Sequence, residues 1–215
     1  MSHHHGGYVE GPIPGLPGPL PEGETLLWQG SPDWKRLALT ALHLRLVALW
    51  FAALLAFALV SGDGLSGLGP TLVAAVLSLG LLALLAWAMA RSAIYSITSK
   101  RVVMRYGVAL PKCINIPFGI VESAGLRRYR DGTGDLPLAL RLKRGDRLGW
   151  AMLWPHARPW KLARPQPMLR AVPDAERVAA ILGQALLEAN PQGQRVAVEP
   201  VRETVRAGAP QAAAA

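Results

Sequence analysis

The stretch "ETLLWQGSPDW", Glu24–Trp34, decides how this chain must be assembled. Leu26 and Trp28 are spaced as on one face of a β-strand, because successive strand side chains point to opposite faces. Gly-Ser-Pro then predicts a turn. A long apolar run begins only a few residues later, at Leu37. We therefore expect residues 24–34 to be the first strand of a domain whose other strands begin near Ile94.

Two apolar segments follow this first strand. They cover Leu37–Val60, with 24 residues, and Thr71–Ala90, with 20 residues and no charge. About 20 predominantly apolar residues suffice to cross a bilayer as a helix. The ten residues between them, "SGDGLSGLGP", are rich in turn-formers. The sequence therefore predicts a transmembrane helical hairpin over 37–60 and 71–90, inserted within one domain.

The cations that flank these segments predict their orientation. Lys and Arg accumulate on the cytoplasmic side of short membrane loops. They occur before the first segment and after the second, whereas the connecting loop has none. We expect a two-pass protein of the inner membrane, with both termini and the domain cytoplasmic and a short periplasmic loop. The expected interface anchors are Trp34, Lys35, Arg36, Trp87 and Arg91.

Composition supports a membrane protein with a basic extramembrane part. Hydrophobic residues make up 51% of the 215 residues and charged residues 17%, with a net charge of +9. Residues 91–215 hold 20 Lys and Arg against nine Asp and Glu. Such a domain beside a bilayer is attracted to anionic lipid, which we favour over nucleic acid as its partner. The single cysteine, Cys113, excludes an intrachain disulfide.

After Ala90 the apolar pattern becomes that of β-strands. Apolar residues alternate in "RVVMRYG", in "LPLALRL" over 136–142 and in "LGWAMLW" over 148–154, with "DGTGD" and "KRGDR" as hairpin turns. A helix with Asp174 as N-cap then runs to Asn190. We expect an α+β fold in which residues 94–190 form an antiparallel barrel or sandwich capped by this helix. Residues 1–23, with a histidine triplet at 3–5, and 191–215 are predicted to be disordered tails.

Several stretches resemble a known family. "ETLLWQGSP", "YSITSKRVVMRYG" and "IPFGIVES" resemble strands of bacterial PH-like domains, some of which carry two inserted transmembrane helices. "LPGPLPEGETLLWQGSPDW", "GLRRYRDGTGDLPLAL" and "LWPHARPW" resemble the PuhB family of photosynthetic-complex assembly proteins over about residues 15–190. The resemblance implies an inner-membrane scaffold or chaperone for the reaction centre and core light-harvesting complex. It implies no catalytic residue.

Two candidate sites follow from the residues. His43 lies in the first apolar segment and is a candidate bacteriochlorophyll ligand, against the alternative of a polar side chain that reaches the interface. A basic surface is a candidate site for anionic lipid or a partner, against the alternative of an ordinary solvated surface. It comprises Lys100, Arg101, Arg127, Arg128, Arg130, Lys143 and Arg144.

The function classes can be ordered from these observations. The sequence has no Ser/His/Asp set, paired carboxylates in an apolar setting, phosphate loop or metal-ligand spacing, so we expect neither an enzyme nor a metal site. The first hypothesis is an assembly factor that contacts reaction-centre and core-antenna subunits. The alternatives are a general PH-like membrane protein of envelope stress or transport, and a membrane enzyme of pigment metabolism. Homodimerisation through the helices or a strand edge is also open.

Overall fold

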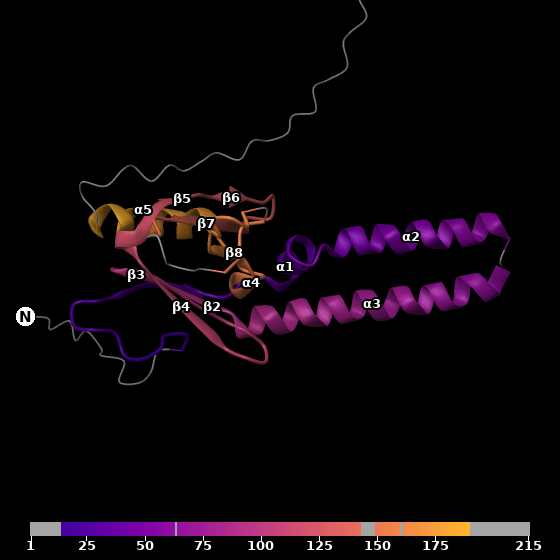
Figure 1. Ribbon diagram of the computed structural model, residues 1–215, viewed down its shortest axis with the longest axis horizontal. Helices are drawn as coiled ribbons and strands as arrows, with labels where there is room; N and C mark the ends of the chain where they lie inside the picture. The colour runs from indigo at the N-terminus through magenta and orange to yellow at the C-terminus, as the bar shows by residue number, and fades with distance from the viewer. Residues whose placement is uncertain (1–13, 63, 143–148, 160, 190–215) are drawn as a thin grey trace, which may run out of the picture.

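The protein is an α+β domain from which two long helices project. The computed structural model describes residues 14–62, 64–142, 149–159 and 161–189. The domain lies at one end of the molecule, and the two helices leave it and extend to the other end (Figure 1). The predicted residues Lys143 and Arg144, the "KRGDR" turn, the histidine triplet and the tail 191–215 lie outside the described residues.

The first sheet is an antiparallel meander that is interrupted by the helices. Its order is β1 (Leu26–Gly30), β2 (Ile94–Thr98), β3 (Arg101–Tyr106) and β4 (Lys112–Pro117). Gln29 of β1 lies opposite Ser96 of β2, and the side chain of Gln29 donates to the Ser96 hydroxyl at 2.8 Å. The predicted pairing of the first strand with strands beyond the helices is therefore confirmed.

The second sheet is built around β7 (Gly134–Leu140). The strands β5 (Val121–Ala124) and β6 (Arg127–Arg128) pair along one edge of β7, and β8 (Met168–Val172) pairs along the other. The short 3-10 helix η1 (Phe118–Ile120) connects the two sheets. Among the described residues no strand pairing joins the sheets, so they form an open two-sheet arrangement and not a closed barrel.

The segment 148–154 was predicted to be a strand, and this is wrong. The structure has the short helix α4 (Trp150–Leu153) there, with Gly149 as its N-cap. Leu153 is buried, whereas Met152 and Trp154 on either side are exposed. One turn of helix satisfies this burial pattern, because it turns a single apolar side chain inward where a strand would have buried alternate residues.

The core lies between the two sheets and is covered by α5 (Ala175–Ala189). The predicted helix is confirmed, with Val178, Leu182 and Leu186 buried at helical spacing. The core is made chiefly of aliphatic and aromatic side chains from both sheets, among them Tyr95, Ile97, Met104, Ile116, Phe118, Leu136, Leu138 and Leu169.

The first apolar segment is two helices and not one. The chain forms α1 (Trp34–Thr40), breaks at 41–43, and continues as α2 (Leu44–Ser61). Leu37 is fully buried and packs with Ala90 and Ala171. The apolar start of this segment therefore belongs to the domain and not to the projecting helix pair, because β8 offers it an apolar contact that a sequence pattern cannot reveal.

The helices α2 and α3 (Gly64–Ser92) pack side by side (Figure 1). At a rise of about 1.5 Å per residue, the 18 residues of α2 extend about 27 Å, close to the thickness of a bilayer's hydrocarbon core. Both helices are long and apolar enough to cross a membrane. The expected ten-residue loop is shorter, because α3 already includes residues 64–70, with Pro70 inside it.

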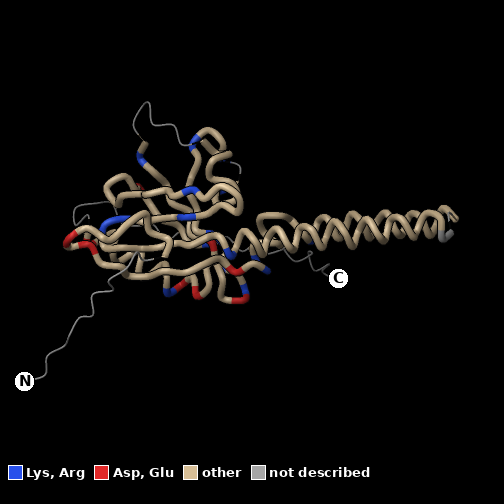
Figure 2. Tube along the Cα trace, turned by 90° about the horizontal axis from the view of Figure 1, so that it is seen from below, with Lys and Arg blue, Asp and Glu red and all other residues tan. Residues whose placement is uncertain are grey.

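Small residues mediate the contact between these two helices. Ala58, Ala75 and Ala86 are buried, so the backbones approach closely there. Large apolar side chains such as Leu49, Phe57 and Leu77 are more than 60% exposed. Among the described residues, Lys, Arg, Asp and Glu lie in the domain and at its end of the helix pair (Figure 2).

Residues 14–23 were expected to belong to a disordered tail, and this is wrong. The Pro14 carbonyl accepts a hydrogen bond from the Gln29 side chain at 2.6 Å, and Leu16 is buried. The chain thus packs against the first sheet from Pro14 onward, because this segment brings one apolar side chain to the domain. Residues 1–13 lie outside the described part of the chain.

Candidate functional site

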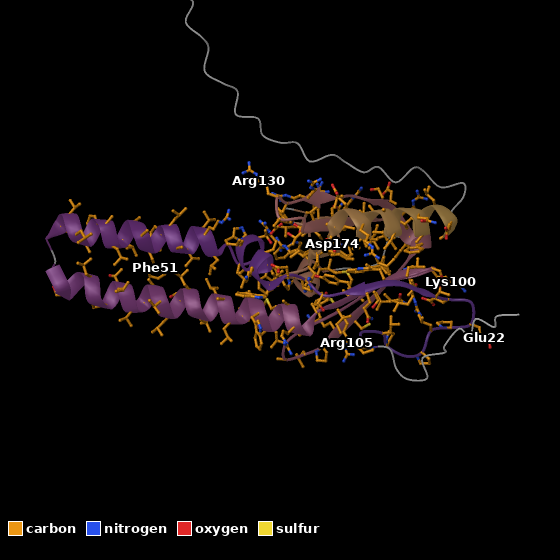
Figure 3. The ribbon with its side chains drawn as sticks, turned by 180° about the vertical axis from the view of Figure 1, so that it is seen from behind. Glu22, Phe51, Lys100, Arg105, Arg130 and Asp174 are labelled. Carbon is orange, nitrogen blue, oxygen red and sulfur yellow. The ribbon has the colours of Figure 1, made fainter. Side chains whose placement is uncertain are left out.

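The predicted basic surface is divided between two ends of the domain. Arg130 lies toward the helix pair, whereas Lys100 lies at the far end (Figure 3). Nε of Arg101 contacts Oε1 of Glu24 at 2.7 Å, and the Glu24 side chain is only 3% exposed. Arg101 therefore holds the start of β1 against β3 and is not a free surface cation. Lys100 and Arg130 therefore do not share one patch, whereas Lys143 and Arg144 lie outside the described residues.

Arg127 and Arg128 form β6, and Arg130 lies in the turn that follows it, so the three remain close together along the chain. Arg128 forms an ion pair with Glu176 of α5, and the Arg127 guanidinium lies 5.4 Å from the centre of the Tyr129 ring. All three arginines are exposed. This smaller group, the β6 arginines, is the part of the predicted basic surface that faces the helix end of the domain.

Four of the expected interface anchors form two tryptophan–cation pairs, one at the start of α1 and one near the end of α3. The Lys35 ammonium is 5.9 Å from the Trp34 ring centre, and the Arg91 guanidinium is 5.4 Å from the Trp87 ring centre. Trp34 and Trp87 are 38% and 46% exposed. An exposed tryptophan beside a cation is typical of a membrane–water interface.

Arg36 does not belong with these anchors. Its side chain is 16% exposed, forms an ion pair with Asp131, and stacks 4.5 Å from the centre of the Tyr129 ring. It therefore fixes α1 to the turn after β6. The Asp131 pKa is lowered to about 2, first by a hydrogen bond from the Thr133 hydroxyl and also by Arg36.

His43 lies at the break between α1 and α2. It is the N-cap residue of α2, has a left-handed backbone with φ of 54°, and is exposed. Its Nδ1 lies 3.2 Å from the Ala41 carbonyl oxygen. The side chain therefore lies at the domain end of the helix pair and not along α2.

A buried polar network that the sequence analysis missed connects these elements. Asp135 is 2% exposed, and its two carboxylate oxygens accept hydrogen bonds from the Tyr129 hydroxyl at 2.6 Å and from the Ala171 backbone N–H at 2.9 Å. The Ala171 carbonyl in turn accepts from the Asp33 N–H at 2.8 Å. Asp135 thereby joins β7, β8 and the start of α1.

Arg170 is the centre of this network. It is 6% exposed and lies on β8, whose other four residues are apolar and buried. One guanidinium nitrogen donates to the Pro155 carbonyl at 2.8 Å, and the other donates to the Thr40 carbonyl at 2.9 Å. Thr40 is the last residue of α1. Arg170 therefore fixes the point at which the chain leaves the domain for α2.

His156 and Tyr95 complete the network behind Arg170. The Tyr95 hydroxyl lies 2.6 Å from Nδ1 of His156 and accepts a hydrogen bond from the backbone N–H of Arg170 at 3.3 Å. Burial lowers the His156 pKa to about 3 and raises the Tyr95 pKa well above its usual value. Both side chains are therefore neutral at physiological pH, and together they support Arg170 without adding a second charge.

We call Asp33, Arg36, Thr40, Asp131, Asp135, His156 and Arg170, with Tyr95 and Tyr129, the junction network. The clearest sequence signal for it was an arginine inside the apolar strand "MLRAV". A charged residue in a buried strand requires fixed partners, but those partners lie more than a hundred positions away in some cases. From the sequence, Asp135 was predicted only to end the hairpin turn "DGTGD".

The chemistry of the junction network is structural. Its groups hold the helix pair in a fixed relation to both sheets. Among the described residues, no group of three or more His, Cys, Asp or Glu side chains is placed to hold a metal ion.

Comparison with known proteins places this architecture in a family. The family model described as "Bacterial PH domain" matches residues 38–186. The chain belongs to the bacterial PH domain family. A curated relative from Rhodobacter capsulatus is 44% identical over 187 residues, which cover 81% of this chain and 85% of the relative. That relative is named as an uncharacterized 23.7 kDa protein in the puhA 5′ region. No solved structure matches this bacterial PH domain protein.

Proposed function

We propose that this bacterial PH domain protein is a two-pass inner-membrane scaffold that assists assembly of the photosynthetic reaction centre and its core antenna. The observation that carries the proposal is the Rhodobacter capsulatus relative, which is similar over most of both chains and lies in the region of a photosynthesis gene. The resemblance to the PuhB family through "GLRRYRDGTGDLPLAL" and "LWPHARPW" points to the same role.

The exposed surface of the helix pair supports a place in the membrane. Its large apolar side chains face outward, and the charged residues that the structure describes lie at the domain end (Figure 2). Lys35 and Arg91 lie at that end, beside Trp34 and Trp87. Because cations favour the cytoplasmic side, we assign the domain and both termini to the cytoplasm and the short α2–α3 connection to the periplasm.

The junction network supports a scaffolding role. Arg170 and Arg36 fix α1 to the domain, so a membrane subunit held by the helices would keep a defined position relative to one held by the domain.

Ala52 and Ala56 lie one turn apart on α2 and are exposed. Small residues on a lipid-facing surface allow another helix to approach closely, so we propose this face as the contact for a membrane subunit.

The cytoplasmic contact that we propose is the group of β6 arginines. They are exposed beside the helix end of the domain, where an anionic lipid or an acidic partner surface can reach them. The proposal includes no catalytic step and no cofactor.

His43 as a pigment ligand has its own test. Bacteriochlorophyll should copurify with the wild-type protein and not with His43→Ala if the histidine binds it.

The proposal is tested by deleting the gene in the bacterium that encodes this chain and following reaction-centre assembly by pulse–chase labelling. We expect slower assembly, restored by the wild-type gene but not by a variant with Arg127, Arg128 and Arg130 all changed to Glu. The matched control changes Lys100, Lys161 and Arg164 to Glu, which alters the net charge equally at exposed positions elsewhere.

Two outcomes would contradict the proposal. Unchanged assembly in the deletion strain would refute the assembly role. An envelope defect during growth without photosynthesis, with assembly intact, would instead favour the general PH-like membrane protein. Equal rescue by the arginine variant and the control would remove the β6 arginines from the mechanism.

A further inference from the structure

An apolar cavity opens between the domain and the last turns of α3. Its volume is about 280 Å³. The lining comes from the end of α3 through Leu85, Met89 and Ser92, from residues 106–110 at the end of β3 and in the β3–β4 connection, from Lys112 at the start of β4, and from the segment Trp154–His156. We call it the α3 cavity. Its volume lies just below the range of about 300–1,000 Å³ for small-molecule sites, so it suits part of a ligand and not a bulky whole molecule.

The connection between β3 and β4 carries an exposed apolar tip. Val108 and Leu110 are 55% and 76% exposed. Gly107 has a φ of 123°, and a Cβ there would meet the Leu110 carbonyl oxygen at 2.2 Å, so the tip needs glycine to take this shape. The tip lies beside the end of α3 (Figure 1). Exposed apolar residues held next to a spanning helix are suited to the bilayer interface.

The α3 cavity is continuous with the apolar surface of the helix pair. The membrane-length segment of α3 runs from Ser66 to Ser92, so the α3 residues that line the cavity belong to its last turns. Leu81 and Leu84, just before them, are 65% and 59% exposed. An acyl chain lying along α3 would therefore reach the cavity without leaving an apolar environment.

The cavity lining also includes one lysine, at the start of β4. Lys112 is exposed, lines the cavity, and takes part in none of the ion pairs found among the described residues. The ammonium group is suited to a phosphate. The Tyr106 hydroxyl donates to the Met152 carbonyl at 2.8 Å, which holds β3 against α4 and keeps the cavity wall in place.

We propose that the α3 cavity binds one acyl chain of a bilayer phospholipid, with Lys112 at the head-group phosphate and the Val108–Leu110 tip immersed in the cytoplasmic interface. This inference rests on the membrane insertion in the proposed function. Its consequence is a third point of membrane contact, besides α2 and α3, on the opposite sheet from the β6 arginines. The domain would then be held against the bilayer through both sheets.

The first test measures immersion of the tip in the full-length protein. Cys113 is replaced by Ser, single cysteines are introduced by Leu110→Cys, Val76→Cys and Leu187→Cys, and each is labelled with a fluorophore. The proteins are placed in nanodiscs of phosphatidylcholine and phosphatidylglycerol with lipid spin-labelled near the head group. We expect at least twofold quenching at position 110 and little at position 187, an exposed leucine of α5.

The label at position 76, in the middle of α3, separates two kinds of failure. For this site the spin label is placed at the chain end of the lipid. Quenching at 76 without quenching at 110 overturns the present inference and leaves membrane insertion intact. No quenching at either site overturns the insertion itself, and the inference with it.

The second test measures the bound lipid directly. Phospholipid that remains with the protein after detergent purification is counted by native mass spectrometry. Leu85→Trp fills the cavity from a position already 36% exposed, so the fold should tolerate it, and Leu72→Trp places the same side chain elsewhere on α3. We expect the bound phospholipid to fall severalfold for Leu85→Trp only, and Lys112→Gln to weaken the preference for phosphatidylglycerol. Equal retention by the two tryptophan variants overturns the proposal.

Discussion

The neutral imidazole of His156 makes the stability of the domain depend on pH. Burial lowers the pKa of this group from 6.5 to about 3, and the nearby Arg170 acts in the same direction. Between these two values the unfolded chain binds a proton that the folded chain does not. Stability is therefore complete above pH 6.5 and is lost as the pH falls toward 3.

The expected loss follows from these two values. Between pH 7 and pH 5 the histidine of the unfolded chain becomes almost fully protonated, while His156 in the folded protein stays neutral. Integrating the difference gives a loss of about 2 kcal/mol in the free energy of unfolding. Asp131, with a pKa lowered to about 2, contributes in the same direction but only below its unfolded value of 3.8, so it leaves this window clear.

The assay is guanidinium unfolding of the full-length protein in nanodiscs, followed by near-ultraviolet circular dichroism at pH 7 and pH 5. His156→Gln should be less stable at pH 7 by roughly 1–3 kcal/mol, because it leaves polar atoms imperfectly paired, but should lose most of the pH dependence. The exposed His43, changed to Gln, is the matched control and should behave like the wild type. An unchanged pH dependence in His156→Gln would refute the assignment of a buried neutral histidine.

Three further substitutions test the fold around the helix junction and the first sheet. Arg170→Met should lower the free energy of unfolding by roughly 1–3 kcal/mol for each carbonyl left unpaired, and protease cleavage after Thr40 should increase. Gly107→Ala should cost roughly 1–3 kcal/mol from backbone strain, seen as a lower melting temperature, whereas Gly183→Ala on α5 should not destabilise. Glu24→Gln should cost roughly 1–3 kcal/mol by weakening its contact with Arg101, measured as faster hydrogen exchange in β1.

The inserted architecture could be read from the sequence because it depends on local patterns. Alternation around Trp28, two long apolar runs and renewed alternation after Ile94 each report on their own neighbourhood. The pairing of β1 with β2 then followed, because a lone strand must find a partner. The prediction failed where burial came from distant parts of the chain. Leu37 looked like part of a span until β8 and the end of α3 were seen to cover it.

The candidate sites divide in the same way. The β6 arginines and the Trp87–Arg91 pair could be found from sequence, because neighbours along the chain are neighbours in space. Arg36 was predicted to be an interface anchor and Arg101 to belong to the basic surface, but each has an acidic partner dozens of positions away. A sequence shows the charge of such a residue and not the carboxylate that neutralises it.

By itself, the sequence determined the helix pair, its insertion into one domain, and the concentration of positive charge outside the apolar segments. These properties depend on composition and on periods of two or about 3.6 residues, which short windows contain. Only the tertiary structure decided the junction network and the α3 cavity. Arg170 bonds to Thr40 and Pro155, and the cavity joins α3 to the β3–β4 tip, through contacts between segments that the chain itself holds far apart.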